Sequence, residues 1–475
     1  MEEEGEVEEC KFRILMFPWL AHGHIFPFIE LSKHLSRRSC FHVYFCSTAI
    51  NLVSIRKHIR NEYPTIQLVE LPMAASPELP PQFHTTKALP PRLWPNLLKA
   101  FQESSCSFQD ILDSLKPDFL IYDFFQPWAP KIALSRGIDS AFFAASGAAS
   151  YAFYYHMYME GTSSTFPYPA IHLQDYEMID FGFRKSIKDA EDNEFLFGNF
   201  ALSRDVILMK SCRAVERKYI DYLSDICKKR VVITGPLIAD ANEAYPYDDE
   251  EMLAKIMEWL SGKSKRSTVY VSFGSEYFLS GDELGEIAKG LELCDANFLW
   301  VVRFPSEEKT GRIEEAMPKG FLDRVVERGM IVRGWAPQTK ILAHRSIGSF
   351  MSHCGWSSVM ESMYFGVPII AMPMKSEQPA NARLATEVGV GVEVGKSRDG
   401  RYTGEEMAKT ISMVMAETPF CEDLRNRAIR VSKEMRENAE GEASRVAEEL
   451  QTLCTNKKKK TTTTTTTTRR NHEYK

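Results

Sequence analysis

The feature that most constrains the fold is a repeated alternation of short apolar stretches with segments of helical periodicity. "FRILMFPWL", "FHVYFCS" and "DFLIYDFF" have the length and composition of strands, and "IFPFIELSKHLSRR" has apolar residues at helical spacing. We expect "AHGH" at 21–24 to form a tight turn, with Pro27 in the first turn of the helix that follows. Strands that alternate with helices favour βαβ units and a parallel sheet.

The alternation stops at a polar, acidic segment, "ADANEAYPYDDEE", and then starts again. "STVYVSFGS", "NFLWVVRF", "GMIVRGWAP" and "GVPIIAMP" read as strands, and "SGDELGEIAKGLELC" reads as a capped amphipathic helix. The sequence therefore predicts an α/β protein with two doubly wound parallel-sheet domains, 1–238 and 253–454, joined by a linker at 239–252. Ligands of such sheets bind at the carboxyl ends of the strands, so a cleft between the domains is the expected site.

The last residues, 455–475, differ from the rest because they are a basic, threonine-rich tail that we expect to be disordered. Without this tail the chain carries 51 Lys and Arg against 63 Asp and Glu. An acidic body of this kind argues against a nucleic-acid partner.

The location of the protein is predicted from three further observations. The acidic start, "MEEEGEVEEC", is unlike a signal peptide, and no apolar run approaches the roughly 20 residues of a membrane span. The ten cysteines include no C-x-x-C pair and are expected to be reduced, buried thiols. We therefore expect a cytoplasmic protein that does not insert into membranes.

His24 and Asp123 form the first candidate site, since each comes just after an apolar strand of the first half. A neutral imidazole can accept a proton from a hydroxyl, and a carboxylate on its other nitrogen would fix the tautomer. Two alternatives stay open from the spacing alone. His24 is a structural residue at a helix start, or it forms an H-x-H metal pair with His22, although no nearby Asp, Glu or Cys completes a ligand set.

The second candidate site is the stretch "HCGWSSVMESMYFG", which follows the apolar run "IGSFMS" and reads as a helix beginning near Gly355. Free backbone N–H groups and the positive end of the helix dipole make such a start a phosphate site. His353, Ser357 and Ser358 can add hydrogen bonds to phosphate oxygens. Cys354 has no visible set of partners and is expected to be a small packed residue rather than a nucleophile.

At this point the residues identify a family. The 44 residues from Trp335 to Gln378, "WAPQTKILAHRSIGSFMSHCGWSSVMESMYFGVPIIAMPMKSEQ", resemble the plant secondary-product glycosyltransferase box. "GHI" after the first strand, "IYDFF", "VSFGS" and "GPL" are similar to the same family, so the resemblance covers residues 10 to 454. It implies the family 1 UDP-glycosyltransferases, with the GT-B fold of two Rossmann-like domains that face a cleft. It also implies final helices that pack back toward the N-terminal domain.

The resemblance implies a role for each position of the box. Trp335 would stack on the uracil ring, with Ala336 and Gln338 at its edge, and Glu361 would accept hydrogen bonds from the ribose. The remaining positions would contact the rest of the donor: His353, Ser358 and Ser275 the diphosphate, and Trp356, Glu377 and Gln378 the sugar. His24 would be the general base and Asp123 its partner in a direct displacement with inversion, with no cofactor and no metal.

Two residues depart from the pattern of the box, and both bear on the donor. Ser357 stands where the box usually has Asn, and Glu377 where it usually has Asp. Gln378 and Trp356 are similar to those of glucose users, so UDP-glucose is the expected donor co-substrate rather than a xylose or rhamnose nucleotide.

The acceptor is predicted from "FPWLAHGH", "SFGSEYFLS" and Ser357, which resemble the plant group that adds a sugar to the sugar of a glycoside. A small flavonoid, lignan or triterpenoid glycoside is therefore expected, bound by the N-terminal half through 83–101 and other aromatic segments that we expect to be loops. The alternatives are a glucosyltransferase for bare aglycones and an inactive nucleotide-sugar-binding protein. We expect a monomer.

Overall fold

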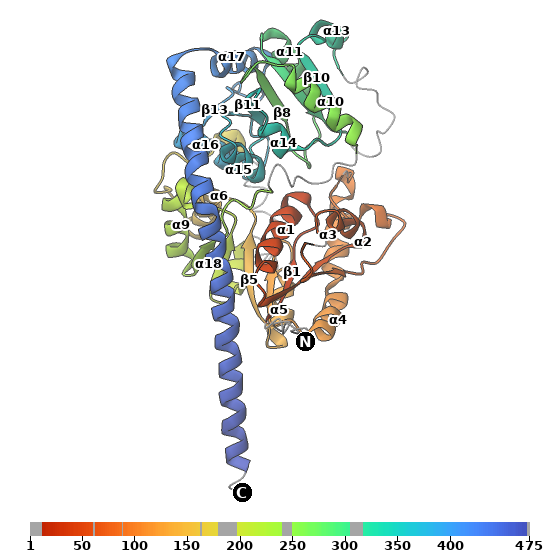
Figure 1. Cartoon of the computed structure of the whole chain (residues 1–475), viewed down its shortest axis with the longest axis vertical. Coiled ribbons are helices and arrows are strands. Elements are labelled where there is room, and N and C mark those ends of the chain that lie inside the picture. Colours follow the sequence, from red (N-terminus) through yellow and green to blue (C-terminus); the bar gives the residue numbers. More distant parts are fainter. Residues whose placement is uncertain are drawn as a thin grey trace, which may run out of the picture.

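The computed structural model describes residues 12–59, 62–87, 89–161, 164–178, 197–239, 249–304 and 317–472, with side chains described as far as 459. It consists of two α/β units, one above the other in Figure 1, each built on a parallel sheet. Within these residues no helix has both the length and the apolar character needed to cross a bilayer. Most of the linker predicted at 239–252 lies outside the described residues.

The N-terminal unit has a seven-stranded sheet in the order β3-β2-β1-β4-β5-β6-β7. All of its pairs are parallel. The strands are β1 (Phe12–Phe17), β2 (Phe41–Ser47), β3 (Ile66–Glu70), β4 (Phe119–Tyr122), β5 (Asp139–Ala144), β6 (Val206–Met209) and β7 (Arg230–Ile233). The helices are α1 (His22–Ser36), α2 (Ala49–Arg56), α3 (Trp94–Glu103), α4 (Ser105–Leu115), α5 (Trp128–Ser135), α6 (Ala148–Glu160), α8 (Asn199–Leu202) and α9 (Arg213–Cys227). The chain order reverses between β1 and β4, and this switch point is where such sheets bind ligands.

The C-terminal unit has a six-stranded parallel sheet in the order β10-β9-β8-β11-β12-β13, with its switch point between β8 and β11. Its strands are β8 (Thr268–Ser272), β9 (Asn297–Val302), β10 (Gly329–Arg333), β11 (Ile347–Ser352), β12 (Ile369–Ala371) and β13 (Gly391–Glu393). The helices are α10 (Glu250–Ser261), α11 (Gly281–Leu293), α13 (Phe321–Val325), α14 (Gln338–Leu342), α15 (Trp356–Tyr364), α16 (Gln378–Val388), α17 (Gly404–Met415) and α18 (Pro419–His472). Two parallel-sheet Rossmann-like units confirm the predicted fold class.

Several local predictions can be compared with these elements. The start of α11 has the expected cap, because Ser280 and Glu283 form a complete capping box. The turn predicted at 21–24 is wrong: α1 already begins at His22, so Pro27 lies inside the helix. The aromatic loop expected at 83–101 is also partly wrong, since residues from Trp94 onward form α3. Proline directly after Trp94 suits the first turn of that helix, and this is a signal that the aromatic composition concealed.

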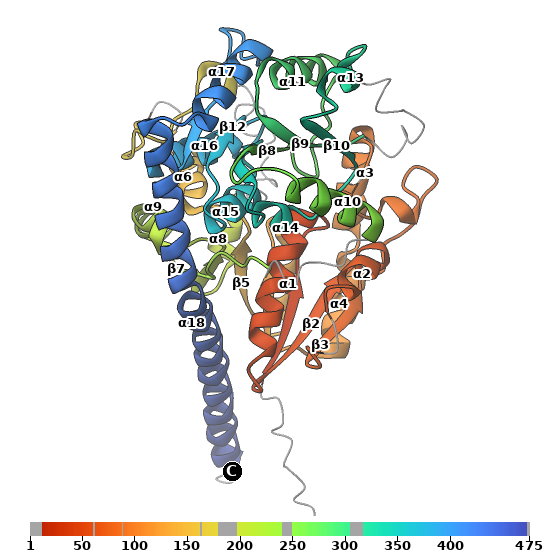
Figure 2. The same ribbon diagram turned by 45° about the horizontal axis from the view of Figure 1, so that its top comes forward.

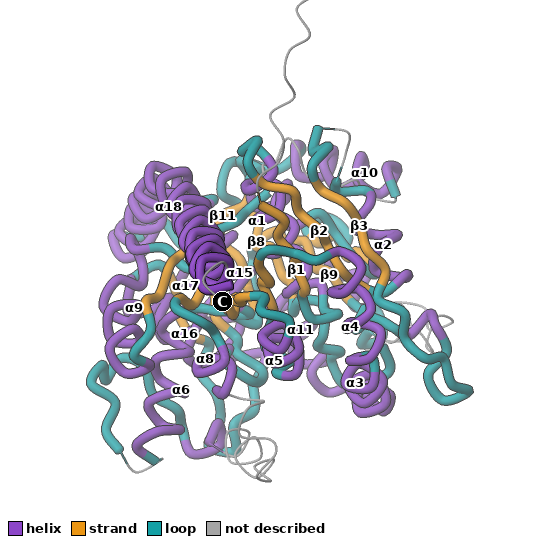
Figure 3. The backbone as a smooth tube through the Cα atoms, turned by 90° about the horizontal axis from the view of Figure 1, so that it is seen from below, coloured by secondary structure: helices purple, strands orange, loops and turns teal. Residues whose placement is uncertain are grey.

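Helix α18 connects the two units. It starts beside α15 and α17 and continues past α9, β7 and α1 (Figures 1 and 2). Val446, Ala447, Leu450 and Cys454 are buried in the core of the N-terminal unit. Figure 3 shows the helix close to end-on, on one side of the two sheets.

The structure differs from the expected disorder of the tail, because α18 continues to His472. Lys457 Nζ donates to the Asp118 carbonyl at 3.3 Å, and Lys458 Nζ lies 4.6 Å from the centre of the Phe12 ring. The first lysines of the tail therefore have partners on the N-terminal unit, which composition alone does not reveal.

One apolar cluster is shared by the two units. It runs from the N-terminal sheet through α6 and α9 into α15 and α16, and it includes Tyr219, Trp356 and Leu384. On this side the units have a continuous core, whereas polar side chains line the space between the switch points of the two sheets.

Candidate active site

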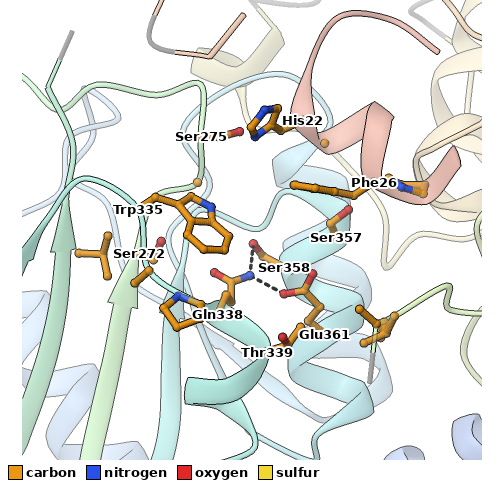
Figure 4. Close-up of a pocket in the computed structure, with 18 of the residues that line it drawn as sticks. His22, Phe26, Ser272, Ser275, Trp335, Gln338, Thr339, Ser357, Ser358 and Glu361 are labelled. Carbon is orange, nitrogen blue, oxygen red and sulfur yellow. Dashed lines mark hydrogen bonds between the residues drawn. The ribbon is translucent and has the colours of Figure 1, made fainter. Parts of the chain in front are cut away.

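A pocket lies between the two units, at the carboxyl ends of their strands (Figure 4). The N-terminal unit supplies residues of α1 and the end of β6. The C-terminal unit supplies the segments after β8, β9 and β10 and the start of α15. The lining residues used below are His22, Lys210, Ser275, Arg303, Trp335, Ala336, Gln338, Ser357, Ser358 and Glu361.

Seven of the predicted donor residues therefore share one wall of this pocket: Ser275, Trp335, Ala336, Gln338, Ser357, Ser358 and Glu361. Gln338 connects two of them, since its Nε2 donates to Ser358 Oγ at 3.1 Å and to Glu361 Oε2 at 2.8 Å (Figure 4). Burial raises the pKa of Glu361, although Lys210 and the Gln338 hydrogen bond act in the opposite direction. The Trp335 indole stands over this group, with Ala336 and Gln338 on the same edge of the sheet.

His353 lies beside this wall, packed between two glycine backbones. A Cβ atom on Gly274 would lie 2.4 Å from His353 Nε2, and one on Gly355 would lie 2.5 Å from it, so only glycine fits at either position. Burial, with a smaller effect of Lys375, lowers the pKa of His353 to about 4. The imidazole is therefore neutral at physiological pH, and among the described residues its buried Nδ1 has no hydrogen-bond partner.

The turn that presents His353 is held in a conformation that few residues adopt. Cys354 has a φ of 63°, in the left-handed region, and is fully buried. Its N–H donates to Ser352 Oγ at 3.1 Å, and its carbonyl accepts from Asn381 Nδ2 at 3.0 Å. The thiol is thus a packed group, and burial raises its pKa well above the usual range of a reactive cysteine.

His24 and Asp123 meet as the sequence predicts, at the carboxyl ends of β1 and β4. His24 Nδ1 is 2.8 Å from Asp123 Oδ2. Asp123 also accepts from the backbone N–H groups of Trp19 and Phe124, at 3.0 and 2.7 Å, and is 1% exposed. The carboxylate is fixed, whereas the His24 side chain remains 29% exposed.

The electrostatics of His24 suit a base that works near neutral pH. Burial is the largest influence on the His24 pKa and lowers it, but the charge and hydrogen bond of Asp123 outweigh burial. Glu276 and Glu377 act in the same direction, so the His24 pKa is raised above its ordinary value. With Nδ1 bonded to the carboxylate, Nε2 is the nitrogen that can accept a proton.

The residues predicted to contact the sugar do not line this pocket. They are Glu377, Gln378 and Trp356, and each has different surroundings. Glu377 is close enough to His24 to raise its pKa. Gln378 is 5% exposed, and its amide oxygen accepts from the N–H groups of Met374 and Lys375. The Trp356 indole is buried, and its Nε1 donates to the Lys210 carbonyl at 2.6 Å. Because this indole packs against the N-terminal unit, the first N–H of α15 is the group that Trp356 can offer to a ligand.

Three pocket residues with basic side chains were missed as donor-site candidates: Lys210, Arg303 and His22. Lys210 and Arg303 each follow an apolar strand directly, in "VILMK" and "FLWVVR", and this position at the carboxyl end of a strand was the available signal. Burial, with Lys87 and Arg303 nearby, lowers the pKa of His22 to about 3, so its ring is neutral.

Comparison with known proteins assigns the chain to a family. The family model "Glycosyltransferase, N-terminal domain" matches residues 11–239, and "UDP-glucoronosyl and UDP-glucosyl transferase" matches residues 214–431. A mogroside IIIx synthase from Siraitia grosvenorii is 48% identical over 433 residues, which are 90% of this chain and 94% of that protein. The chain belongs to the UDP-glycosyltransferase family.

Two further proteins are similar to this UDP-glycosyltransferase. A β-D-glucosyl crocetin β-1,6-glucosyltransferase from Gardenia jasminoides is 44% identical, over 93% of this chain and 98% of that one. The crystal structure of a Glycyrrhiza uralensis glycosyltransferase, UGT73P12, complexed with glycyrrhetinic acid 3-O-monoglucuronide, is 21% identical and superposes with a TM-score of 0.83. It covers 98% of this chain and 100% of that one, so the two share the GT-B fold.

The site gives the UDP-glycosyltransferase two adjoining regions with different chemistry. An aromatic ring and hydrogen-bonding groups form the pocket on the C-terminal unit, and a histidine–carboxylate pair lies at the edge of the N-terminal unit. Within the described residues, no group of three or more His, Cys, Asp or Glu is placed to hold a metal ion.

Proposed function

We propose that this enzyme transfers glucose from UDP-glucose, with inversion, to a hydroxyl group on the sugar of a small plant glycoside. The observation that carries the proposal is the His24–Asp123 pair, anchored at 2.8 Å beside the pocket with the seven donor residues. The donor binds with its uracil against Trp335 and its ribose at Glu361. Its diphosphate lies near His353, Ser275 and Ser358.

The reaction is a single displacement. His24 Nε2 takes the proton of the acceptor hydroxyl as that oxygen attacks the anomeric carbon of glucose. The bond from this carbon to the β-phosphate oxygen breaks, and UDP leaves with the electron pair. Asp123 stabilises the imidazolium, and the N-terminus of α15 stabilises the charge of the departing diphosphate.

The surroundings of His24 support a glycoside as the acceptor. Phe125 lies 6.1 Å from the His24 ring, between centroids, and also contacts Trp94 at 6.2 Å, so an apolar surface lies on one side. Glu276 and Glu377 are close enough to raise the His24 pKa. Carboxylates are good acceptors for sugar hydroxyls, and aromatic rings suit a triterpenoid, flavonoid or lignan. The Gardenia relative, named for a glucosyl substrate, supports the same choice.

The test uses UDP-glucose with matched pairs of an aglycone and its monoglucoside, followed by mass spectrometry. A hexose gained by the glucosides alone would support extension of a sugar chain. A hexose gained mainly by the aglycones would refute the acceptor assignment and favour an ordinary aglycone glucosyltransferase.

His24→Ala separates the enzyme from an inactive nucleotide-sugar-binding protein. We expect this variant to lose transfer while its affinity for UDP stays within about twofold of wild type, because His24 lies outside the donor pocket. Turnover equal to wild type would refute the base assignment.

We further infer that the protein acts as a cytoplasmic monomer without a metal ion. Both walls of the pocket come from one chain, and buried cysteines such as Cys46, Cys212 and Cys354 are free thiols, which suits a reducing compartment. Gel filtration at assay concentration and turnover in the presence of EDTA test these two points.

A further inference from the structure

Lys210 crosses from one unit to the other inside the pocket. It follows β6 directly, and its Nζ donates to Ser357 Oγ at 2.9 Å, in the first turn of α15. Its carbonyl accepts from the Trp356 indole at 2.6 Å. Both ends of the residue are thus fixed to the start of the helix that is expected to hold phosphate.

The charge of Lys210 is poorly compensated by the protein. The residue is 2% exposed, and none of the ion pairs found among the described residues includes it. Burial lowers the pKa of Lys210 to about 8, and the two carboxylates that counteract this, Glu361 of α15 and Glu30 of α1, act only from a distance. A buried ammonium whose hydrogen-bond partner is a neutral hydroxyl carries a desolvation cost that an anionic ligand offsets.

The small side chain of Ser357 leaves room in the pocket for the ammonium group of Lys210. The serine hydroxyl is short, and the side chain that the family usually has here would reach further into the pocket. Lys210 Nζ lies at the tip of this hydroxyl, 2.9 Å away. It therefore occupies the space beyond Ser357 and adds a positive charge there, next to the free N–H groups of the helix.

We propose that Lys210 is a donor-binding residue whose ammonium contacts the diphosphate of the UDP-sugar across the cleft, together with Ser357 and the N-terminus of α15. The proposal rests on the proposed use of this pocket for the donor. Negative charge on the diphosphate increases as the glycosidic bond to it breaks, so the contact strengthens toward the transition state and favours departure of UDP. Because the lysine belongs to the N-terminal unit, a donor that contacts it is bound by residues of both units.

The experiment compares UDP with uridine by isothermal titration calorimetry. Lys210→Met removes the charge at similar length, and Lys210→Gln is measured beside it because its amide can keep a hydrogen bond to Ser357. We expect both variants to bind UDP about 10- to 100-fold more weakly than wild type, the range for loss of a charge-assisted hydrogen bond, and uridine within twofold. The kcat of transfer should also fall.

Lys218→Met is the matched control. Lys218 of α9 also reaches the other unit, where it pairs with Glu387 of α16, but it lies outside the pocket. This variant should bind UDP as wild type does, which separates loss of the diphosphate contact from loss of a lysine between the units.

Three results would overturn the proposal: unchanged affinity for UDP in a folded Lys210 variant, equal weakening of UDP and uridine, or the same loss in Lys218→Met. The assay contains no acceptor, so it separates this proposal from the proposed function. A selective loss of UDP binding would support the role of Lys210 even if glucose were never transferred to a glycoside.

Discussion

Replacing Asp123 with Asn tests whether the fixed carboxylate is what makes His24 a base. The carboxylate oxygen that lies 2.8 Å from His24 Nδ1 also accepts from the Trp19 N–H, so two hydrogen bonds fix its position. In the Asn variant the amide oxygen keeps this place, because an amide nitrogen there would face the Trp19 N–H. His24 would then have a neutral partner at Nδ1, and the imidazolium formed on proton transfer would lose the negative charge that stabilises it.

The size of the effect follows from the function that is lost. General base catalysis contributes roughly 10²- to 10⁴-fold, so kcat should fall by about 10³-fold in Asp123→Asn. The loss corresponds to roughly 4 kcal/mol of transition-state stabilisation. UDP affinity should be retained, because neither Asp123 nor His24 lines the donor pocket.

The assay is the pH dependence of kcat for wild type and variant at saturating UDP-glucose. In wild type the rate should rise with pH as the imidazolium loses its proton, with an apparent pKa above the ordinary value for histidine because Asp123 raises the His24 pKa. The residual activity of the variant should reach its plateau at lower pH, since the charge that raised the pKa is gone. A wild-type kcat, or an unshifted profile, would refute the reasoning.

Three further predictions concern the donor pocket and the cores. Trp335→Ala should weaken UDP and uridine equally, by about tenfold or more, because a lost stack on a base costs roughly 1–3 kcal/mol; calorimetry with both ligands checks this. Burial raises the pKa of Glu216 to about 7. The stability from this bound proton is complete below about pH 4.5 and disappears as the pH rises through 7. Glu216→Gln should therefore match wild type at about pH 4 and be up to about 3 kcal/mol more stable at about pH 8. Denaturant titrations at both pH values measure this, and equal differences would contradict it. Arg383→Met should destabilise the protein by about 3 kcal/mol in urea, because it leaves Glu177, its partner at 2.8 Å and only 5% exposed, as an unpaired buried carboxylate; an unchanged midpoint would be the contrary result.

The fold and much of the site could be predicted because they depend on local patterns. Apolar runs of strand length identified the two sheets, and residues directly after those runs, such as His24 and Asp123, are brought together by parallel pairing. The local pattern could not predict the direction in which a side chain points. Trp356 begins the expected helix, yet its indole packs on the N-terminal unit, and this depends on contacts between residues far apart in the sequence.

Lys210 is a second residue whose role could not be predicted from a local pattern. Its position directly after a strand places it at the ligand-binding edge of the sheet, but the sequence does not show that α15 of the other unit lies within hydrogen-bond distance of it. The start of α1 was missed for a different reason, since Gly23 and two histidines are weak helix formers and Pro27 suggested a later start.

The path of α18 determines how the cleft can open. This 54-residue helix packs on both units, on the side where they also share an apolar cluster. Separation there would require bending the helix or exposing that cluster, so the units can rotate only about an axis near α18. The displacement then grows with distance from this axis and is largest on the opposite side, where α10 faces α2 and α3 (Figure 2). Spin labels placed on α10 and α3 would report entry and exit of the nucleotide, whereas a pair on α18 and α9 would keep a constant separation throughout turnover.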